Sequence, residues 1–208
     1  MTTPLPTLYK RDQVERGIAA TTRRISNAQD RPDAGLKADM KRLFDVDRAI
    51  GVPTRKGPLS RYAFFDGPPP GRGIDLTYSF ECTFALLVAE RLLNGGLTQL
   101  RAVTRVRTIR PKLDAKVREI LTHYVPDDQR RYLPLPSRED MVFLMTPLGR
   151  SADLDLEKIV FCSVSDVGGS LVDFANLREP VIAIELVNLV TLLRHALERI
   201  PVRKRGRS

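Results

Sequence analysis

The chain has 208 residues, of which 42% are hydrophobic, so it can bury the core of one ordinary domain or of two small ones. Lys and Arg number 34 against 25 Asp and Glu, and the resulting net charge of +9 favours an anionic partner. No uncharged apolar run reaches the roughly 20 residues of a membrane span, and the N-terminus lacks the basic and apolar regions of a signal peptide. We therefore expect a cytoplasmic protein without a membrane partner.

Charge is unevenly distributed along the chain. Residues 1–125 hold 22 Lys and Arg against 13 Asp and Glu, whereas residues 126–200 hold 8 against 12. Residues 201–208 add four cations and no acid. We predict a basic DNA-binding domain at 1–125 and a small α+β dimerisation or sensing domain at 138–200. The basic tail at 201–208 is predicted to be disordered, and it either attracts phosphates or only aids solubility.

Two amphipathic helices are expected near the N-terminus. Residues 9–25 and 36–50 both carry apolar residues at helical spacing, and a polar connection separates them at 26–35. Gly51 ends the second helix. The outer faces of these helices carry cations that are candidates for contact with a nucleic acid: Arg23, Arg24, Lys37, Lys41 and Arg42.

A β-hairpin is predicted next. Residues 61–65 and 74–77 are rich in aromatic and β-branched side chains, and the connection 67–73 is stiffened by three prolines. Arg61 begins the first strand and Arg72 projects from the tip. A hairpin that follows two helices and carries an arginine at its tip fits the wing of a winged helix-turn-helix protein. A plain structural hairpin or a proline-rich loop is the alternative.

The central segment predicts further helices. Residues 78–110 are predicted to form two helices joined by Asn94-Gly95-Gly96; Ser79 caps the first and Gly95-Gly96 ends it. The second runs from 98 to 110 and places Arg101 and Arg105 on its outer arc, where they touch phosphates at most. Pro111 closes this helix or starts a third at 112–123. A solvated helix face is the simpler interpretation of this outer arc.

The C-terminal part is predicted to combine short strands with one long helix. We expect strands at 141–146, 158–164 and 171–174, a turn at Gly168-Gly169, and a helix at 181–200 whose first four residues could as well extend as strand. Because that helix is apolar on most sides, we predict that the small sheet covers one face and that a second copy of the chain covers another. A homodimer through this region is the expected assembly.

Chemistry-bearing residues are few. Cys82 and Cys162 each lie in an apolar run and are interpreted as buried thiols, and a disulfide between them is the alternative. The two histidines have no neighbours that specify a catalytic triad, and no Cys/His cluster or phosphate-binding glycine loop is present. The sequence therefore predicts no enzyme, no metal and no cofactor.

The order helix, helix, hairpin, helix, helix over residues 9–110 resembles the MerR-type winged helix-turn-helix domain of bacterial transcription regulators. The closest local likeness is 78–110, where a Tyr-led helix, a turn ending in Gly96-Leu97-Thr98 and an amphipathic helix follow one another. The resemblance implies DNA binding, with the helix before the wing in the major groove and the wing on the adjacent backbone. It would give Lys37, Lys41 and Arg42 a groove-side role, and Arg61 and Arg72 a wing role.

The sequence thus predicts an α+β, mostly helical protein with a winged helix-turn-helix-like N-terminal region and a small α+β C-terminal region that ends in a long helix. We expect a transcriptional regulator that binds double-stranded DNA, without excluding a protein-interaction or assembly module, such as an accessory or mobile-element structural protein, whose basic face docks on an acidic protein. The predicted DNA-binding residues are Arg23, Arg24, Lys37, Lys41, Arg42, Arg61, Arg72, Arg101 and Arg105.

Overall fold

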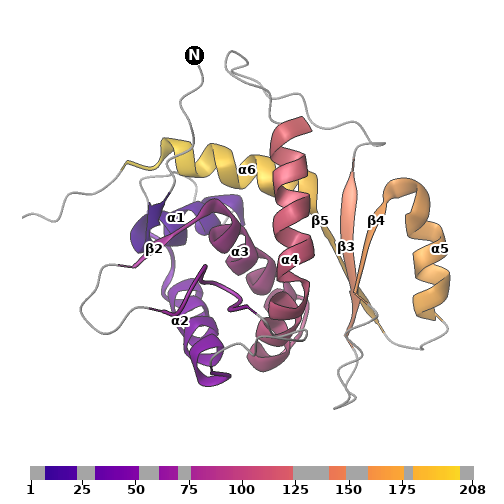
Figure 1. The fold of residues 1–208 in the computed structure, drawn as a ribbon, viewed down its shortest axis with the longest axis horizontal. Coiled ribbons are helices and arrows are strands. Elements are labelled where there is room, and N and C mark those ends of the chain that lie inside the picture. The colour runs from indigo at the N-terminus through magenta and orange to yellow at the C-terminus, as the bar shows by residue number, and fades with distance from the viewer. Residues whose placement is uncertain are drawn as a thin grey trace, which may run out of the picture.

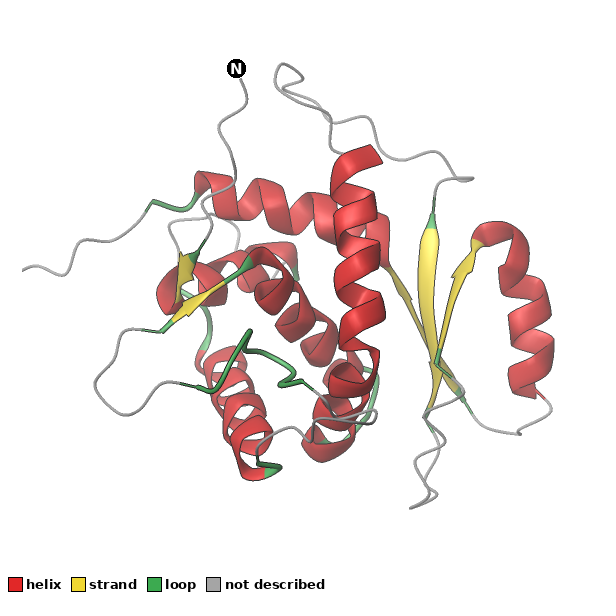
Figure 2. Cartoon of the chain, viewed as in Figure 1, coloured by secondary structure: helices red, strands yellow, loops and turns green. Residues whose placement is uncertain are grey.

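The computed structural model describes residues 8–22, 31–51, 61–69, 76–123, 141–148, 159–175 and 180–201. Within these ranges the protein is α+β and mostly helical, as predicted (Figure 2). In chain order the elements are β1 (Tyr9–Lys10), α1 (Arg11–Thr21), α2 (Ala34–Ala49), β2 (Thr77–Tyr78), α3 (Phe80–Asn94), α4 (Gln99–His123), β3 (Val142–Pro147), β4 (Val160–Ser163), α5 (Val164–Ala175), β5 (Val181–Glu185) and α6 (Leu186–Arg199).

A body of five helices lies beside a small sheet. Helices α1, α2, α3, α4 and α6 form the body; α4 lies beside the sheet in Figure 1, and α3 and α6 also contact its strands. The sheet is antiparallel with the strand order β4-β3-β5, and α5 lies on the side away from α4 (Figure 1). Strands β1 and β2 form a separate antiparallel pair in which Tyr9 faces Tyr78. Helix α2 lies at the lower edge of the helical body, below α1 and α3 in Figure 1.

The turn between α3 and α4 confirms the predicted helix boundaries. The Ser79 hydroxyl accepts a hydrogen bond from the Cys82 amide at 3.1 Å, which caps the first turn of α3. At the other end the Leu97 amide donates to the Leu92 carbonyl at 3.1 Å, and Gly96 adopts a φ of +99°. Because residues other than glycine rarely adopt this left-handed backbone conformation, Gly96 makes the tight turn between α3 and α4 possible.

Helix α4 is one continuous element, whereas the sequence predicted two helices divided near Pro111. Apolar residues on both sides of the proline, Val106, Ile109, Leu113 and Val117, recur every three or four positions and are all buried. One apolar face therefore continues through the proline, and packing along it outweighs the loss of a single backbone hydrogen bond.

The first strand of the predicted wing is wrong. Residues 61–69 form a loop, and β2 pairs with β1 instead of with residues 61–65. Tyr62, Phe64 and Phe65 are buried, and both phenylalanine rings pack against the ring of Phe44 on α2 with centroids 5.7 Å apart. The aromatic residues at 62–65 therefore pack in the core from a loop, although their composition is typical of a strand. The predicted hairpin tip, with Arg72, lies outside the described residues.

The predictions of a turn at Gly168-Gly169 and a strand at 171–174 are also wrong, because α5 includes both segments. Val167 and Phe174 pack with Met145 of β3 and Cys162 of β4 in a second, smaller apolar cluster. Burial of this face on the sheet offsets the low helix propensity of two glycines, which costs about 1 kcal/mol each relative to alanine. Tertiary packing has overridden the local signal.

The segment 181–200 begins as strand β5 and continues as α6, so the strand alternative for its first residues is correct. The change occurs at Glu185, whose carboxylate accepts hydrogen bonds from the amides of Val187 at 2.8 Å and Asn188 at 2.9 Å. Partial burial nevertheless raises the pKa of the Glu185 carboxyl above its ordinary value. A side chain that caps the helix therefore marks where the strand ends.

Helix α6 is covered by the chain itself. Val190, Leu193 and Leu197 belong to the same cluster of buried residues as Val14 of α1 and Phe84 of α3. The apolar residues of the two predicted domains, 1–125 and 138–200, therefore meet in one core. The dimer was predicted because α6 needed cover, and that cover comes from α1, α3, α4 and β3. This reason for a second copy no longer holds.

Gly17 allows α1 and α6 to approach closely, because a Cβ atom placed there would lie 2.7 Å from Leu197 Cδ2. We expect Gly17→Val to lower the free energy of unfolding by about 1–3 kcal/mol through overpacking, measured by urea denaturation. The matched control is Gly168→Val in α5, where no atom lies within 4 Å of such a Cβ. The double variant Gly17→Val/Leu197→Ala should lose less free energy of unfolding than the two single variants lose in sum. Strict additivity would argue against a clash between the two side chains.

Candidate nucleic-acid interface

Burial removes equal numbers of positive and negative groups from the surface of the described residues. The buried charged residues are Arg16, Arg105, Arg107 and Arg110 and, with opposite sign, Glu15, Asp47, Glu90 and Asp114. These four cations and four acids all lie within residues 1–125, where the sequence holds its positive surplus. Because the two groups cancel, the positive surplus of the described residues in this range stays outside the core, where an anionic partner can meet it.

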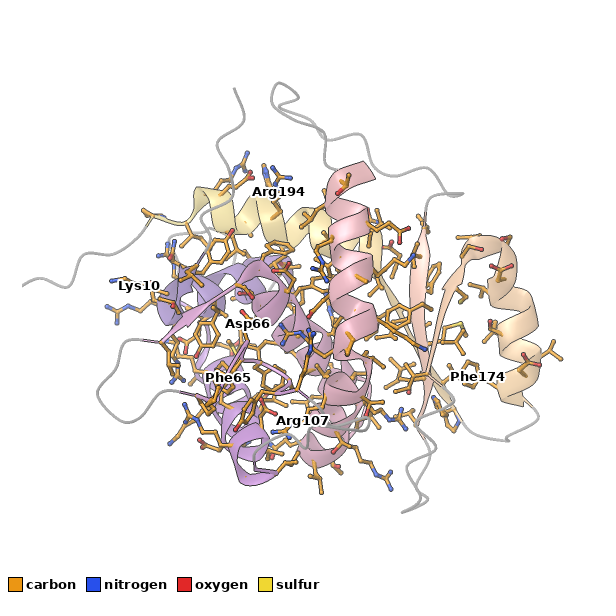
Figure 3. All side chains as sticks on the ribbon, viewed as in Figure 1. Lys10, Phe65, Asp66, Arg107, Phe174 and Arg194 are labelled. Atoms are coloured by element: carbon orange, nitrogen blue, oxygen red, sulfur yellow. The ribbon has the colours of Figure 1, made fainter. Side chains whose placement is uncertain are left out.

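A fully buried ion pair fixes α2 to α4. Arg107 Nε donates to Asp47 Oδ1 at 2.6 Å, and Arg107 Nη2 donates to the main-chain carbonyls of Asp47 and Gly51. The Asp47 carboxylate also accepts the amide hydrogens of Ala63 at 3.1 Å and Phe64 at 3.2 Å. Asp47 therefore ties three segments together, and Figure 3 shows Arg107 and Phe65 in this region. A buried charge with this many partners holds its neighbours in one arrangement.

Arg110 makes a second tie one turn further along α4. Its guanidinium donates to Asp114 Oδ1 at 2.6 Å, to the Ala63 carbonyl at 2.6 Å and to Asp66 Oδ1 at 3.1 Å. The same group donates to the sulfur of Cys82 at 3.3 Å, and burial raises the pKa of the Cys82 thiol to about 11. Cys82 and Cys162 are both buried and free, as the sequence predicted for their thiols. At neutral pH Cys82 is therefore a protonated, unreactive thiol.

The exposed side of α2 carries a line of cations. Lys37, Lys41 and Arg48 are separated by four and seven residues and so follow one another along the helix surface, while Arg42 lies further around it. We call these four residues the α2 basic face. Lys41, Arg42 and Arg48 are exposed and Lys37 is half-buried. The opposite side, with Leu36, Met40 and Leu43, is buried in the core, so the helix can present its cations only outward.

Arg48 belongs to this face although it was not among the predicted contact residues. Its guanidinium carbon lies 5.6 Å from the centroid of the Phe65 ring, and its Nη1 is 3.8 Å from Asp45 Oδ1. The cation–π contact needs Phe65, which the loop at 61–69 brings back to α2. The spacing from Lys37 and Lys41 was a usable sequence signal for Arg48, but no local pattern indicated its contact with the Phe65 ring.

The other predicted contact residues lie in different environments. Arg61 is 58% exposed as a side chain and lies 3.5 Å from Asp114. Arg101 is half-buried near the start of α4. Arg23, Arg24 and Arg72 lie outside the described residues. The structure therefore brings Lys37, Lys41 and Arg42 together, with Arg61 on the segment that Asp47 holds against α2.

The prediction that Arg105 touches phosphates is wrong. Only 7% of the residue is exposed, and its guanidinium donates to the Thr146 hydroxyl and the Pro147 carbonyl of β3. The outer arc expected for this part of α4 faces the sheet instead of solvent. The cause is the return of the chain after residue 140, which places β3 against α4 (Figure 1). Arg105 thus joins the helical body to the sheet and is not available to a phosphate.

Among the described residues, no group of three or more His, Cys, Asp or Glu side chains could hold a metal ion. Likewise, none of the helices in this part of the chain is long and apolar enough to span a membrane.

Comparison with known proteins adds no relative. The chain matches no protein-family model, and neither the search of curated proteins nor the search of solved structures returned a match. The MerR resemblance stays a prediction.

Proposed function

We propose that the protein binds double-stranded DNA and that α2 is the element that meets the duplex. The observation that carries this proposal is the α2 basic face: Lys37, Lys41, Arg42 and Arg48 project from one helix, and the described residues bury as many acids as cations. Cations presented in this way attract the phosphates of a duplex. Transcription regulation is the role that the resemblance to MerR-type regulators implies, and it is part of the proposal.

The rigid support behind α2 favours this function. The Asp47–Arg107 pair and the rings of Phe44, Phe64 and Phe65 attach the helix to α4 and to the segment 61–66. A binding helix held by buried contacts keeps its cations in a defined arrangement before the partner arrives, so that less ordering is needed on binding. A hairpin wing is not part of the proposal, because residues 61–65 do not form a strand.

Binding should weaken steeply with salt. If α2 and Arg61 together neutralise roughly four or five phosphates, the slope of log K against log salt concentration should be about −4, since each neutralised phosphate contributes about −0.9. Fluorescence anisotropy on a labelled duplex of about 20 base pairs, from about 50 to 300 mM salt, measures this slope. Absence of binding at the lowest salt concentration would remove the proposal.

A protein-interaction module is the second candidate, and one observation favours it. Leu171 and Val172 on α5 are 47% and 63% exposed, and the described residues 159–175 contain Asp166 and Asp173 but no cation. Adjacent exposed apolar side chains are typical of protein contacts. The two candidates differ in what co-purifies at low salt: nucleic acid raises the absorbance at 260 nm relative to 280 nm, whereas a protein partner appears as a second band on a gel.

A further inference from the structure

We infer that α2 holds duplex DNA through its phosphate backbone and does not read the bases. This inference rests on the proposed function, and it replaces the groove-reading role that the MerR resemblance implies for Lys37, Lys41 and Arg42. Three features of the helix carry it: the line of its cations, the residue types on its surface, and the pairing of its arginines.

The line of cations has the dimensions of a backbone contact. Arg48 lies 11 positions after Lys37, which is about 16 Å along the helix at 1.5 Å per residue. One strand of a duplex offers a phosphate every 3.4 Å or so along the axis, so several phosphates lie within reach of this line. Lysine is a compact charge on a flexible chain, which suits a phosphate better than the paired donors and acceptors of a base edge.

The amide and hydroxyl side chains that read bases are missing from α2. Its sequence, AGLKADMKRLFDVDRA, contains no Asn, Gln, Ser or Thr. Adenine is recognised most often by the paired donor and acceptor of an Asn or Gln amide, and α2 has no such group. The remaining positions that are not buried are alanine, glycine, Val46 and the carboxylates Asp39 and Asp45, and a carboxylate is repelled by the phosphates that line a groove.

The two arginines that could read guanine are engaged by carboxylates on the same helix. Arg42 Nη1 lies 3.5 Å from Asp39 Oδ1, and Arg48 Nη1 lies 3.8 Å from Asp45 Oδ1. Arg48 is also held over the Phe65 ring. Bidentate recognition of guanine needs both donors on the edge of the guanidinium, so it competes with these contacts. Any sequence selectivity of the protein must therefore come from residues other than those of α2.

Three labelled duplexes of equal length, one A/T-rich, one G/C-rich and one mixed, test the inference by anisotropy at low salt with the full chain. We expect dissociation constants that agree within about threefold, because a base-reading contact would separate them by more than about fivefold per base pair. Lys37→Ala and Lys41→Ala should each reduce the salt slope by about one and weaken binding equally on all three duplexes.

Arg199→Ala is the matched control. It removes one exposed cation from α6, which Figure 1 shows on the side of α1 away from α2, and it should leave the slope unchanged. Circular dichroism of each variant establishes that it is folded. Binding that prefers one duplex more than tenfold, with that preference lost in Lys41→Ala or in Arg42→Ala, would overturn the inference and leave the proposed function standing. No binding to any duplex would overturn both.

Discussion

Asp47→Ala is expected to lower the free energy of unfolding by about 3–5 kcal/mol, because removing one member of a buried ion pair leaves the other charge without compensation. In this protein the loss is compounded, since the buried amides of Ala63 and Phe64 lose the same acceptor. Urea denaturation followed by far-UV circular dichroism gives the free energies of both proteins. This is the largest effect we expect from any polar substitution in α2.

Asp45→Ala is the matched control for this prediction. It removes a carboxylate two residues away on the same helix, where the pair with Arg48 is solvent-exposed and the N–O distance is 3.8 Å. Exposed pairs contribute about 0–1 kcal/mol, so the control should remain close to the unmodified protein. If the two substitutions cost the same, then the Asp47–Arg107 pair does not hold α2 in place.

Leu193→Ala in α6 should destabilise the whole molecule by about 2–5 kcal/mol, the cost of a cavity in a well-packed core. The test uses the tyrosines as local probes. All five tyrosines precede residue 133 and there is no tryptophan, so tyrosine fluorescence reports only the N-terminal part of the chain. Because α6 shares one core with α1 and α3, the urea midpoint seen by tyrosine fluorescence should shift together with the midpoint seen by circular dichroism.

Leu192→Ala is the matched control. It removes the same type of side chain at the preceding position, where the leucine is 49% exposed, and it should change the free energy of unfolding by no more than about 0.5 kcal/mol. A tyrosine transition that stays in place while the circular dichroism curve splits into two phases would contradict the shared core. That outcome would restore two independently folding domains, at 1–125 and 138–200.

Local signals in the sequence predicted much of the helical body correctly. Ser79 and Gly95-Gly96 bound α3 as expected, because a cap and a left-handed glycine act through backbone groups only a few residues away. The outward position of Lys41 and Arg42 was likewise predictable, since helical periodicity alone separates a charged side from an apolar one. The part of the candidate site on α2 was therefore available from the sequence.

Contacts between distant segments decided the rest. The run at 61–65 has the composition of a strand, yet its amides donate to Asp47 and its rings pack on Phe44, two partners that no local pattern specifies. Arg105 has the spacing of a surface residue on α4, but β3 arrives from 40 positions later in the chain and buries it.

The ends of most helices and the apolar side of each can therefore be read from local sequence, because they depend on neighbours within one or two turns. Which charges are internal depends on how the elements pack together. An arginine at helical spacing can face water, as Arg42 does, or a buried carboxylate, as Arg107 does with Asp47. The difference is set by which element packs against it, and that depends on the core as a whole.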